Sequence, residues 1–304
     1  MVNQAISAIP MPTADEFVEK YIAQNQPVIV QGLDFDADAM TPAALKAKLG
    51  DLTALLYGSL FDLEDIITLS DYIDDWFNLP GAMEENIPYV RWYNKLRDVK
   101  FAWGDEAFQR LASAWRMPNC LPKTDFLVPV SAAGAGTNPV CDAFPYRGLL
   151  VAARGARTRL HRDPFCSDAV VCQFYGVKEV ALYRPKRAAE LTKATDGTSF
   201  GGFKDVREDL LDYLSEVPDY RGFLRPGEMV YIPHGWLHDV IVTEDSVSIT
   251  WNFVHSQGAK EFSQYLVSQS DGDTELEILQ YFHRPLGQAP LTAAEISNYH
   301  FGGK

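Results

Sequence analysis

From Gly148 onward, short apolar runs alternate with turn residues along the chain. Short runs that are rich in Val, Ile, Leu, Tyr and Phe and are bounded by Gly, Pro, Asn or Asp predict β-strands. Many such strands in succession are typical of a double-sheet jelly roll, whose interior can hold one ligand. We therefore expect a mainly β protein with flanking helices, built on a double-stranded β-helix barrel. The predicted strands are 148–153, 158–163, 169–174, 179–183, 229–232, 237–242 and 247–254.

Helices are predicted on both sides of this β region. Thr13 and Glu16 have the spacing of a capping box, in which each side chain accepts a hydrogen bond from the backbone of the other residue at a helix start. Thr41-Pro42 starts a second helix that ends at Gly50. Further helices are predicted at 204–214, 259–268, 274–282 and 292–299, and a small-residue loop at 131–139.

These patterns divide the chain into three parts. We expect an N-terminal region of mixed helix and strand packed on the barrel at 1–144, a jelly-roll core at 145–256, and a C-terminal helical segment at 257–304. A length of 304 residues agrees with one main domain, because large β architectures often exceed 200 residues as a single unit.

Charge and cysteine content narrow the class of protein. The chain has 27 Lys and Arg against 41 Asp and Glu, a net charge of −14, so a nucleic-acid partner is not expected. No apolar run reaches the roughly 18 residues of a membrane span, and the first residues lack a basic segment before a long apolar run, so a cytoplasmic protein is expected. The four cysteines contain no Cys-x-x-Cys pair, which indicates reduced thiols.

The strongest chemical signal is His161-Arg162-Asp163 together with His238. Alternate residues of a strand point to the same face, so His161 and Asp163 are expected to project together, about 7 Å apart by backbone rise. A histidine from a later strand would complete three ligands on one side of a metal. Two imidazoles and one carboxylate, with the opposite side open, suit non-haem Fe(II) that activates oxygen.

The same residues also occur in other kinds of site. An isolated His-x-Asp is common in proteins without any metal. A protein-kinase loop would need an Asn five positions after Asp163, but Asp168 stands there. His234 and His238 have the spacing of a helical zinc-protease site, yet Gly235 occupies the position of the general base. We expect His234, His255, His283 and His300 not to be ligands and Trp236 to serve packing.

The surrounding motifs resemble those of the JmjC-type, cupin-like branch of the 2-oxoglutarate-dependent oxygenases. The resemblance runs nearly from end to end, and the motif order is most similar to that of the asparaginyl hydroxylase of hypoxia-inducible factor. Its segments are Gln26–Gly32, Thr158–His161, Gly176–Lys178 with Leu182–Pro185, Pro226–Glu228, Tyr231–His238 and Ile249–Phe253.

This resemblance implies a set of ligands and cosubstrates. It implies that His161, Asp163 and His238 bind Fe(II), that 2-oxoglutarate chelates the iron, and that O2 takes the remaining position. Lys178 matches the family's lysine for the distal carboxylate of 2-oxoglutarate. Cosubstrate contacts are also implied for Thr158, Asn252 and Tyr89, against the alternatives of a strand threonine, a barrel-end asparagine and a core tyrosine.

Some positions depart from the family pattern. Arg184-Pro185 replaces the usual Pro-Pro, and a longer interval between Asp163 and Lys178 leaves Ser167 and Asp168 as alternative equivalents of a family asparagine. Strict alternation places Thr158 on the face opposite His161, so contact with cosubstrate requires a bend near Arg159. Arg157 and Arg159 are expected to be surface cations, with an inward-facing anchor for an acidic substrate as the alternative.

The resemblance leaves three functions to compare. The first is hydroxylation of an unactivated side-chain carbon of a protein, peptide or amino-acid-like substrate, with succinate and CO2 as co-products. The second is N-methyl demethylation by the same family, and the third is a catalytically inactive cupin-like binding protein. The family's use of helices after the barrel also implies a homodimer formed through the C-terminal helices.

Overall fold

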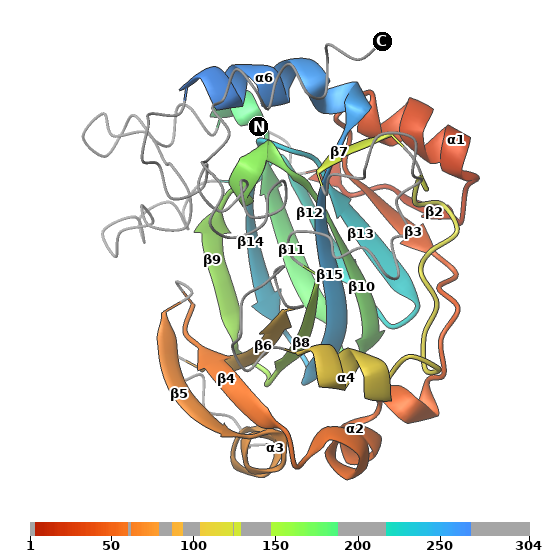
Figure 1. Cartoon of the computed structure of the whole chain (residues 1–304). Coiled ribbons are helices and arrows are strands. Elements are labelled where there is room, and N and C mark those ends of the chain that lie inside the picture. Colours follow the sequence, from red (N-terminus) through yellow and green to blue (C-terminus); the bar gives the residue numbers. More distant parts are fainter. Residues whose placement is uncertain are drawn as a thin grey trace, which may run out of the picture.

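Two β-sheets lie face to face in the computed structural model of the chain (Figure 1). The structure describes residues 4–59, 62–78, 87–93, 104–123, 125–128, 147–187 and 217–268. The loop predicted at 131–139 and the helices predicted at 204–214, 274–282 and 292–299 lie outside these residues.

The smaller sheet has five strands in the order β1-β12-β11-β14-β9. Neighbouring strands run antiparallel, except that β1 pairs parallel with β12. The sequence prediction missed β12 because Gly222 interrupts its short apolar run. The bounds are β1 Gln4–Ala5, β12 Tyr220–Leu224, β11 Lys178–Tyr183, β14 Leu237–Val242 and β9 Arg157–His161.

The larger sheet has ten strands, nine of them in the order β2-β3-β13-β10-β15-β8-β6-β4-β5, while β7 pairs with β15 beside this path. Every strand predicted after residue 147 is present within two residues of its predicted bounds. The predicted fold class, a mainly β jelly roll with flanking helices, is confirmed. The bounds are β2 Ala8–Pro10, β3 Val28–Gln31, β13 Glu228–Ile232, β10 Asp168–Tyr175, β15 Ser246–His255, β8 Gly148–Ala152, β6 Tyr89–Tyr93, β4 Thr53–Tyr57, β5 Leu63–Thr68 and β7 Phe126–Val128.

Helices lie at opposite ends of the sheets, with α1 and α6 at one end and α2, α3 and α4 at the other (Figure 1). The capping box of Thr13 and Glu16 is present, and Thr41 caps α2 as predicted. Among the described helices, none has the length and apolar character needed to cross a bilayer. The helical bounds are α1 Ala14–Phe17, η1 Val18–Ile22, η2 Asp38–Met40, α2 Pro42–Leu49, α3 Leu69–Trp76, α4 Asp105–Arg110, η3 Pro164–Cys166, η6 Ser256–Gly258 and α6 Ala259–Ser268.

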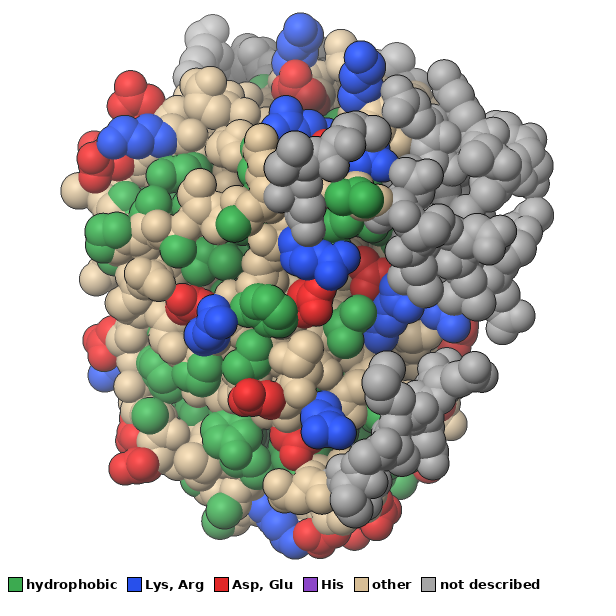
Figure 2. All heavy atoms as spheres, turned by 180° about the vertical axis from the view of Figure 1, so that it is seen from behind, with side chains coloured by type: hydrophobic (Ala, Val, Ile, Leu, Met, Phe, Trp, Pro, Cys, Tyr) green, Lys and Arg blue, Asp and Glu red, His purple; other side chains and the backbone are tan. Residues whose placement is uncertain are grey.

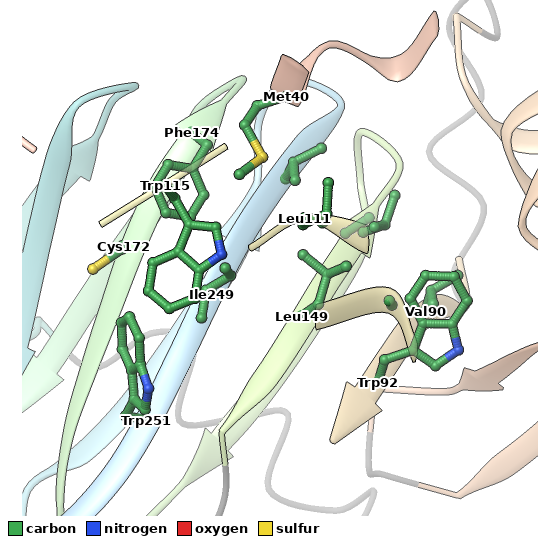
Figure 3. Close-up of a cluster of buried hydrophobic side chains, with 14 of the residues drawn as sticks. Met40, Val90, Trp92, Leu111, Trp115, Leu149, Cys172, Phe174, Ile249 and Trp251 are labelled. Carbon is green, nitrogen blue, oxygen red and sulfur yellow. The ribbon is translucent and has the colours of Figure 1, made fainter. Parts of the chain in front are cut away.

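Strand β15 shows how the larger sheet is buried on both faces. Ile249 and Trp251 point into an apolar cluster that also takes side chains such as Met40 and Leu111 from the N-terminal part of the chain (Figure 3). Ser248, Thr250 and Asn252 alternate with them and are directed between the sheets, because successive strand residues point to opposite faces. The alternation therefore places polar groups inside the jelly roll.

A second apolar cluster fills the other part of the space between the sheets. It contains Val180 and Leu182 from β11 and Val230 and Ile232 from β13. All four side chains are buried. The interior of the jelly roll thus has an apolar part and a polar part, and Thr250 and Asn252 of the polar part line a cavity.

The charged side chains of one face are mixed. Figure 2 shows Lys and Arg interspersed with Asp and Glu across this face, without a continuous basic area over its described atoms. Opposite charges on the described part of this face therefore lie close to one another.

Candidate metal centre

The two sheet-borne histidines are direct neighbours. His161 ends β9, and its register partner on the adjacent strand β14 is His238. Paired residues of antiparallel strands present their side chains on the same face, and the two ring centroids are 4.0 Å apart. Both side chains are buried. The pairing of β9 with β14 therefore brings together two imidazoles that lie far apart in the sequence.

Asp163 lies two residues beyond the end of β9, so the prediction that placed it within the strand is wrong. Its backbone is extended, and the following Phe165 and Cys166 take positive φ angles of 60° and 49°, which non-glycine residues rarely adopt. Asp163 Oδ1 lies 3.8 Å from His161 Nε2, and Asp163 Oδ2 lies 3.7 Å from His238 Nε2. One ligand atom from each residue lies within 4.8 Å of the others.

Hydrogen bonds orient both imidazoles. His161 Nδ1 is 2.8 Å from the carbonyl of Arg159, and His238 Nδ1 is 3.4 Å from the carbonyl of Trp236. A carbonyl oxygen only accepts, so Nδ1 is the donor in both contacts, and each Nε2 lies on the side of the Asp163 carboxylate. Ligating histidines are commonly held by a bond of this kind at the other nitrogen.

Electrostatics favour the ligand form of the histidine. Burial lowers the pKa of His161 well below its ordinary value, and the neighbouring His238 lowers this pKa further. Burial raises the pKa of Asp163, although His238 and the amide of Asn252 oppose that rise. A neutral imidazole is the form that binds a cation, and a bound cation would stabilise the Asp163 carboxylate. The three residues fit a divalent transition metal with open positions.

His161, Asp163 and His238 line a cavity, and Lys178 reaches this cavity from the start of β11. Gly176 precedes it with a φ of 68°, and a Cβ at that position would meet the backbone oxygen of Asp245, so the turn into β11 requires glycine. The Lys178 side chain is buried, and Nζ donates to Ser248 Oγ at 2.5 Å. Burial, followed by the charge of Arg91, lowers the pKa of Lys178 to about 7. Lys178 is thus a buried cation whose charge depends strongly on its surroundings.

Thr158 faces the cavity because β9 contains a bulge. His161 pairs with His238 and Thr158 pairs with Val240, so β9 has one residue more than β14 over this interval. The backbone N–H of Arg159 donates to Ser59 at 3.1 Å instead of joining the ladder. The predicted bend near Arg159 is confirmed.

Asn252 also lines the cavity, and its Nδ2 donates to Ser167 Oγ at 3.2 Å. Tyr89 is buried behind Thr158, with 2.7 Å between its hydroxyl and Thr158 Oγ1, and it is not among the residues that line the cavity. Of the two proposed equivalents of the family asparagine, Ser167 contacts Asn252, whereas Asp168 accepts from Tyr231.

Several residues that were considered as alternatives at the site lie away from the three ligand candidates. His234 donates from Nδ1 to Asp168 at 3.0 Å, and its Nε2 accepts from Asn25 at 2.9 Å. The described residues that line the cavity include neither Arg157 nor Arg159, and Arg157 pairs with the buried Asp239 at 2.5 Å. His283 and His300 lie outside the described residues.

Arg91 and Ser248 are among the polar residues of the cavity region that sequence reasoning missed. Arg91 lies on β6, lines the cavity and is 3% exposed, which is unusual for an arginine. A signal was available, because Tyr89, Arg91 and Tyr93 alternate with Val90 and Trp92, so the polar positions share one face of the strand. The same alternation in β15 would have indicated Ser248.

Comparison with known proteins identifies the family of this chain. Residues 70–259 match the model of the family described as "Cupin-like domain". The chain is 30% identical over 152 residues to the "2-oxoglutarate and iron-dependent oxygenase JMJD4" of Gallus gallus, a match that covers 46% of this chain and 35% of that protein. The resemblance to cupin-like oxygenases is confirmed, whereas the finer similarity to the asparaginyl hydroxylase is not confirmed by these matches.

Two Arabidopsis thaliana relatives match over more of the chain. The "Arginine-specific demethylase JMJ20" is 19% identical over 259 residues, covering 79% of this chain and 55% of that protein. The "Arginine-specific demethylase JMJ22" is 24% identical over 263 residues, covering 84% of this chain and 47% of that protein. The chain therefore spans between about a third and about half of the length of these relatives.

Proposed function

The chain belongs to the cupin-like domain family, and from this premise we propose that it is an iron- and 2-oxoglutarate-dependent oxygenase. The observation that carries the proposal is the joint placement of four side chains. His161, Asp163 and His238 present ligand atoms to one another, and Lys178 lines the same cavity. A cation beside a metal-ligand set suits a cosubstrate that has a chelating end and an anionic end.

Different residues would bind the two ends of the cosubstrate. His161, Asp163 and His238 would hold Fe(II), and Lys178 would pair with the distal carboxylate of 2-oxoglutarate. Thr158 and Asn252, both on the cavity wall, would orient the cosubstrate, and Tyr89 would hold the Thr158 hydroxyl from behind. Bound iron would supply the activation of O2 coupled to conversion of 2-oxoglutarate into succinate and CO2.

The chain's own residues would orient the metal ligands, supply a positive charge and line part of the cavity with apolar groups. The carbonyls of Arg159 and Trp236 fix the two imidazole rings, so the ligand nitrogens are oriented before a metal arrives. Apolar residues such as Ile232 and Val240 line the cavity beside the polar groups. A dry cavity strengthens the attraction between Lys178 and a carboxylate.

We propose hydroxylation of a side-chain carbon in a protein, peptide or amino-acid-like substrate as the principal reaction. N-methyl demethylation is the second candidate, and it is favoured by the relatives named as arginine-specific demethylases, which match over 79% and 84% of the chain. Both reactions would use the same ligands and cosubstrate. They differ in the substrate carbon that is presented to the metal.

The test is turnover of the purified protein with Fe(II), 2-oxoglutarate, O2 and a library of peptides and amino acids. Succinate formation supports the oxygenase, and it should be lost in Asp163→Ala but retained in Asp74→Ala, which changes an exposed carboxylate. A product that gains one oxygen atom indicates hydroxylation, whereas loss of a methyl group with release of formaldehyde indicates demethylation. Iron binding without succinate, with any substrate tried, would instead favour the inactive binding protein.

We also propose that the protein is cytoplasmic. We propose further that it forms a homodimer through its C-terminal helices, of which the structure describes α6. Light scattering after size-exclusion chromatography measures the oligomeric state. The mass of a single copy at micromolar concentration would contradict the dimer and would leave the oxygenase assignment unaffected.

A further inference from the structure

Arg91 and Lys178 approach one cavity from opposite sheets. Arg91 on β6 is the register partner of Leu150 on β8, and Leu150 is the partner of Ser248 on β15. Paired residues share a face, so these three side chains form one row across the larger sheet. Lys178 comes from the smaller sheet and donates to Ser248 at the end of this row.

Hydrogen bonds and stacking fix the Arg91 guanidinium. Nη2 donates to Thr158 Oγ1 at 3.1 Å, Nη1 donates to Tyr93 Oη at 3.4 Å, and the group lies over the Tyr89 ring at 4.2 Å from its centroid. The bond to Thr158 crosses from the larger sheet to the smaller one. Lys178 makes the opposite crossing, so each cation bridges the two sheets through a hydroxyl.

The two cations are buried in a shared electrostatic environment. Arg91 is 3% exposed and Lys178 is 4% exposed. Both groups line the cavity, and like charges repel, so the charge of Arg91 adds to burial in lowering the pKa of Lys178. Burial and repulsion both raise the free energy of this pair, and a carboxylate that contacts both groups would lower it.

We propose that Arg91 is the second cation of the carboxylate subsite, and that it holds the distal carboxylate of 2-oxoglutarate together with Lys178. This inference rests on the proposed function and adds a ligand to it. The planar guanidinium stays protonated and offers parallel N–H groups that match a carboxylate, whereas the ammonium of Lys178 acts as a point charge. The pair would select a dicarboxylate over a monocarboxylate of the same length.

The competing interpretation is that Arg91 only positions Thr158 and Tyr89. Both interpretations predict weaker binding of 2-oxoglutarate when Arg91 is changed, so affinity for that acid alone does not separate them. A matched ligand without the distal carboxylate separates the two interpretations. 2-Oxopentanoate has the same chain length and the same chelating end but a methyl group in place of the distal carboxylate.

The experiment measures the affinity of Mn(II)-loaded protein for both acids by calorimetry, or by competition where binding is weak. The variants are Arg91→Met, Arg91→Gln and Lys178→Met, and Arg225→Gln is the control because Arg225 is an exposed arginine in a turn. We expect Arg91→Met and Arg91→Gln to weaken 2-oxoglutarate binding by about tenfold or more, since a hydrogen bond to a charged group is worth about that much. Binding of 2-oxopentanoate should change less than about twofold, within the context dependence of such contributions. Should Arg91→Met fail to fold, as judged by circular dichroism, the Gln variant carries the test, because its amide can still donate to Thr158.

Each other outcome overturns the inference. Equal weakening of both acids shows that Arg91 only shapes the cavity, and unchanged binding of both shows that it is not a ligand. In these two cases the oxygenase assignment stands, because the wild-type protein still binds 2-oxoglutarate. If the wild-type protein with Mn(II) does not bind 2-oxoglutarate, the proposed function fails as well.

Discussion

Thr158 and His161 lie three positions apart on β9 and nevertheless line the same cavity. In a regular strand an odd separation puts two side chains on opposite faces. The bulge at Arg159 inserts one residue against β14, and it returns Thr158 to the face of the ligands. The strand therefore supplies a metal ligand and a hydroxyl to one site.

The hydroxyl of Thr158 should matter for cosubstrate and not for metal. Thr158→Val removes the atom that contacts both Arg91 and Tyr89 while nearly preserving volume. We expect affinity for 2-oxoglutarate to fall by about tenfold, because a hydrogen bond to a charged group contributes about that much to a binding constant. Calorimetry on the Mn(II)-loaded protein checks this, with Thr243→Val as a matched change at a threonine bonded to the Val177 carbonyl. A parallel loss of Mn(II) affinity would contradict the assignment.

Removal of Asp163 should weaken metal binding. Asp163→Ala leaves two buried imidazoles without the only carboxylate in their group, so we expect the affinity for Mn(II) or Co(II) to fall by about a hundredfold or more. Isothermal titration with each metal measures the change. Asp74→Ala removes an exposed carboxylate and should leave metal affinity unaltered. Equal affinities in the wild type and Asp163→Ala would rule out the proposed ligand set.

Binding of 2-oxoglutarate should weaken as pH rises. Burial lowers the pKa of Lys178 to about 7, and only the protonated form attracts the distal carboxylate. Above that pH the free protein must take up a proton in order to bind, so affinity should fall by about tenfold per pH unit. Titrations between neutral and alkaline pH, in two buffers of different ionisation enthalpy, report both the affinity and the proton uptake. A flat profile with no uptake would show that Lys178 stays charged in the empty cavity.

The same lysine should affect the stability of the ligand-free protein. An exposed lysine keeps its proton up to the ordinary pKa of 10.5, whereas Lys178 loses it near 7. Between these values the unfolded state binds more protons, so the contribution of Lys178 to the free energy of unfolding rises with pH across this window. Urea titrations should show that Lys178→Met stabilises the protein by about 2 kcal/mol or more near pH 6 and less at pH 9. An equal effect at both pH values would contradict the lowered pKa.

The ion pair next to the metal ligands should contribute to stability. Arg157 binds the buried Asp239, which follows His238 on β14, with Arg157 Nε donating at 2.9 Å. Asp239→Asn should lower the free energy of unfolding by about 2 kcal/mol, less than a fully buried pair because Arg157 is partly exposed. Glu179→Gln removes the partner of the more exposed Arg221 on the same sheet and should cost less than about 1 kcal/mol. Equal effects in the two denaturation experiments would count against this ranking.

The strands and the metal-ligand candidates could be predicted from the sequence because their signals are local. Apolar alternation located β8 to β11 and β13 to β15, and Thr13 and Thr41 were recognised as helix caps. His161 and His238 were identified by residue type in predicted strands. Gly176 also follows local rules, since a positive φ in a tight turn favours glycine whatever the rest of the fold. The division into parts at 144 and 256 stays a prediction.

Only the tertiary structure decided how these elements share one cavity. The register of β6 with β8 and of β8 with β15 placed Arg91 in a row with Ser248, and no local pattern encodes which residues become partners across strands. The bulge at Arg159 depends on a hydrogen-bond acceptor, Ser59, that is distant in sequence. Asp163 reaches the histidines from beyond its strand. Long-range pairing sets these distances, and the charge of Lys178 follows from them, because its pKa depends on burial and on the neighbouring cation.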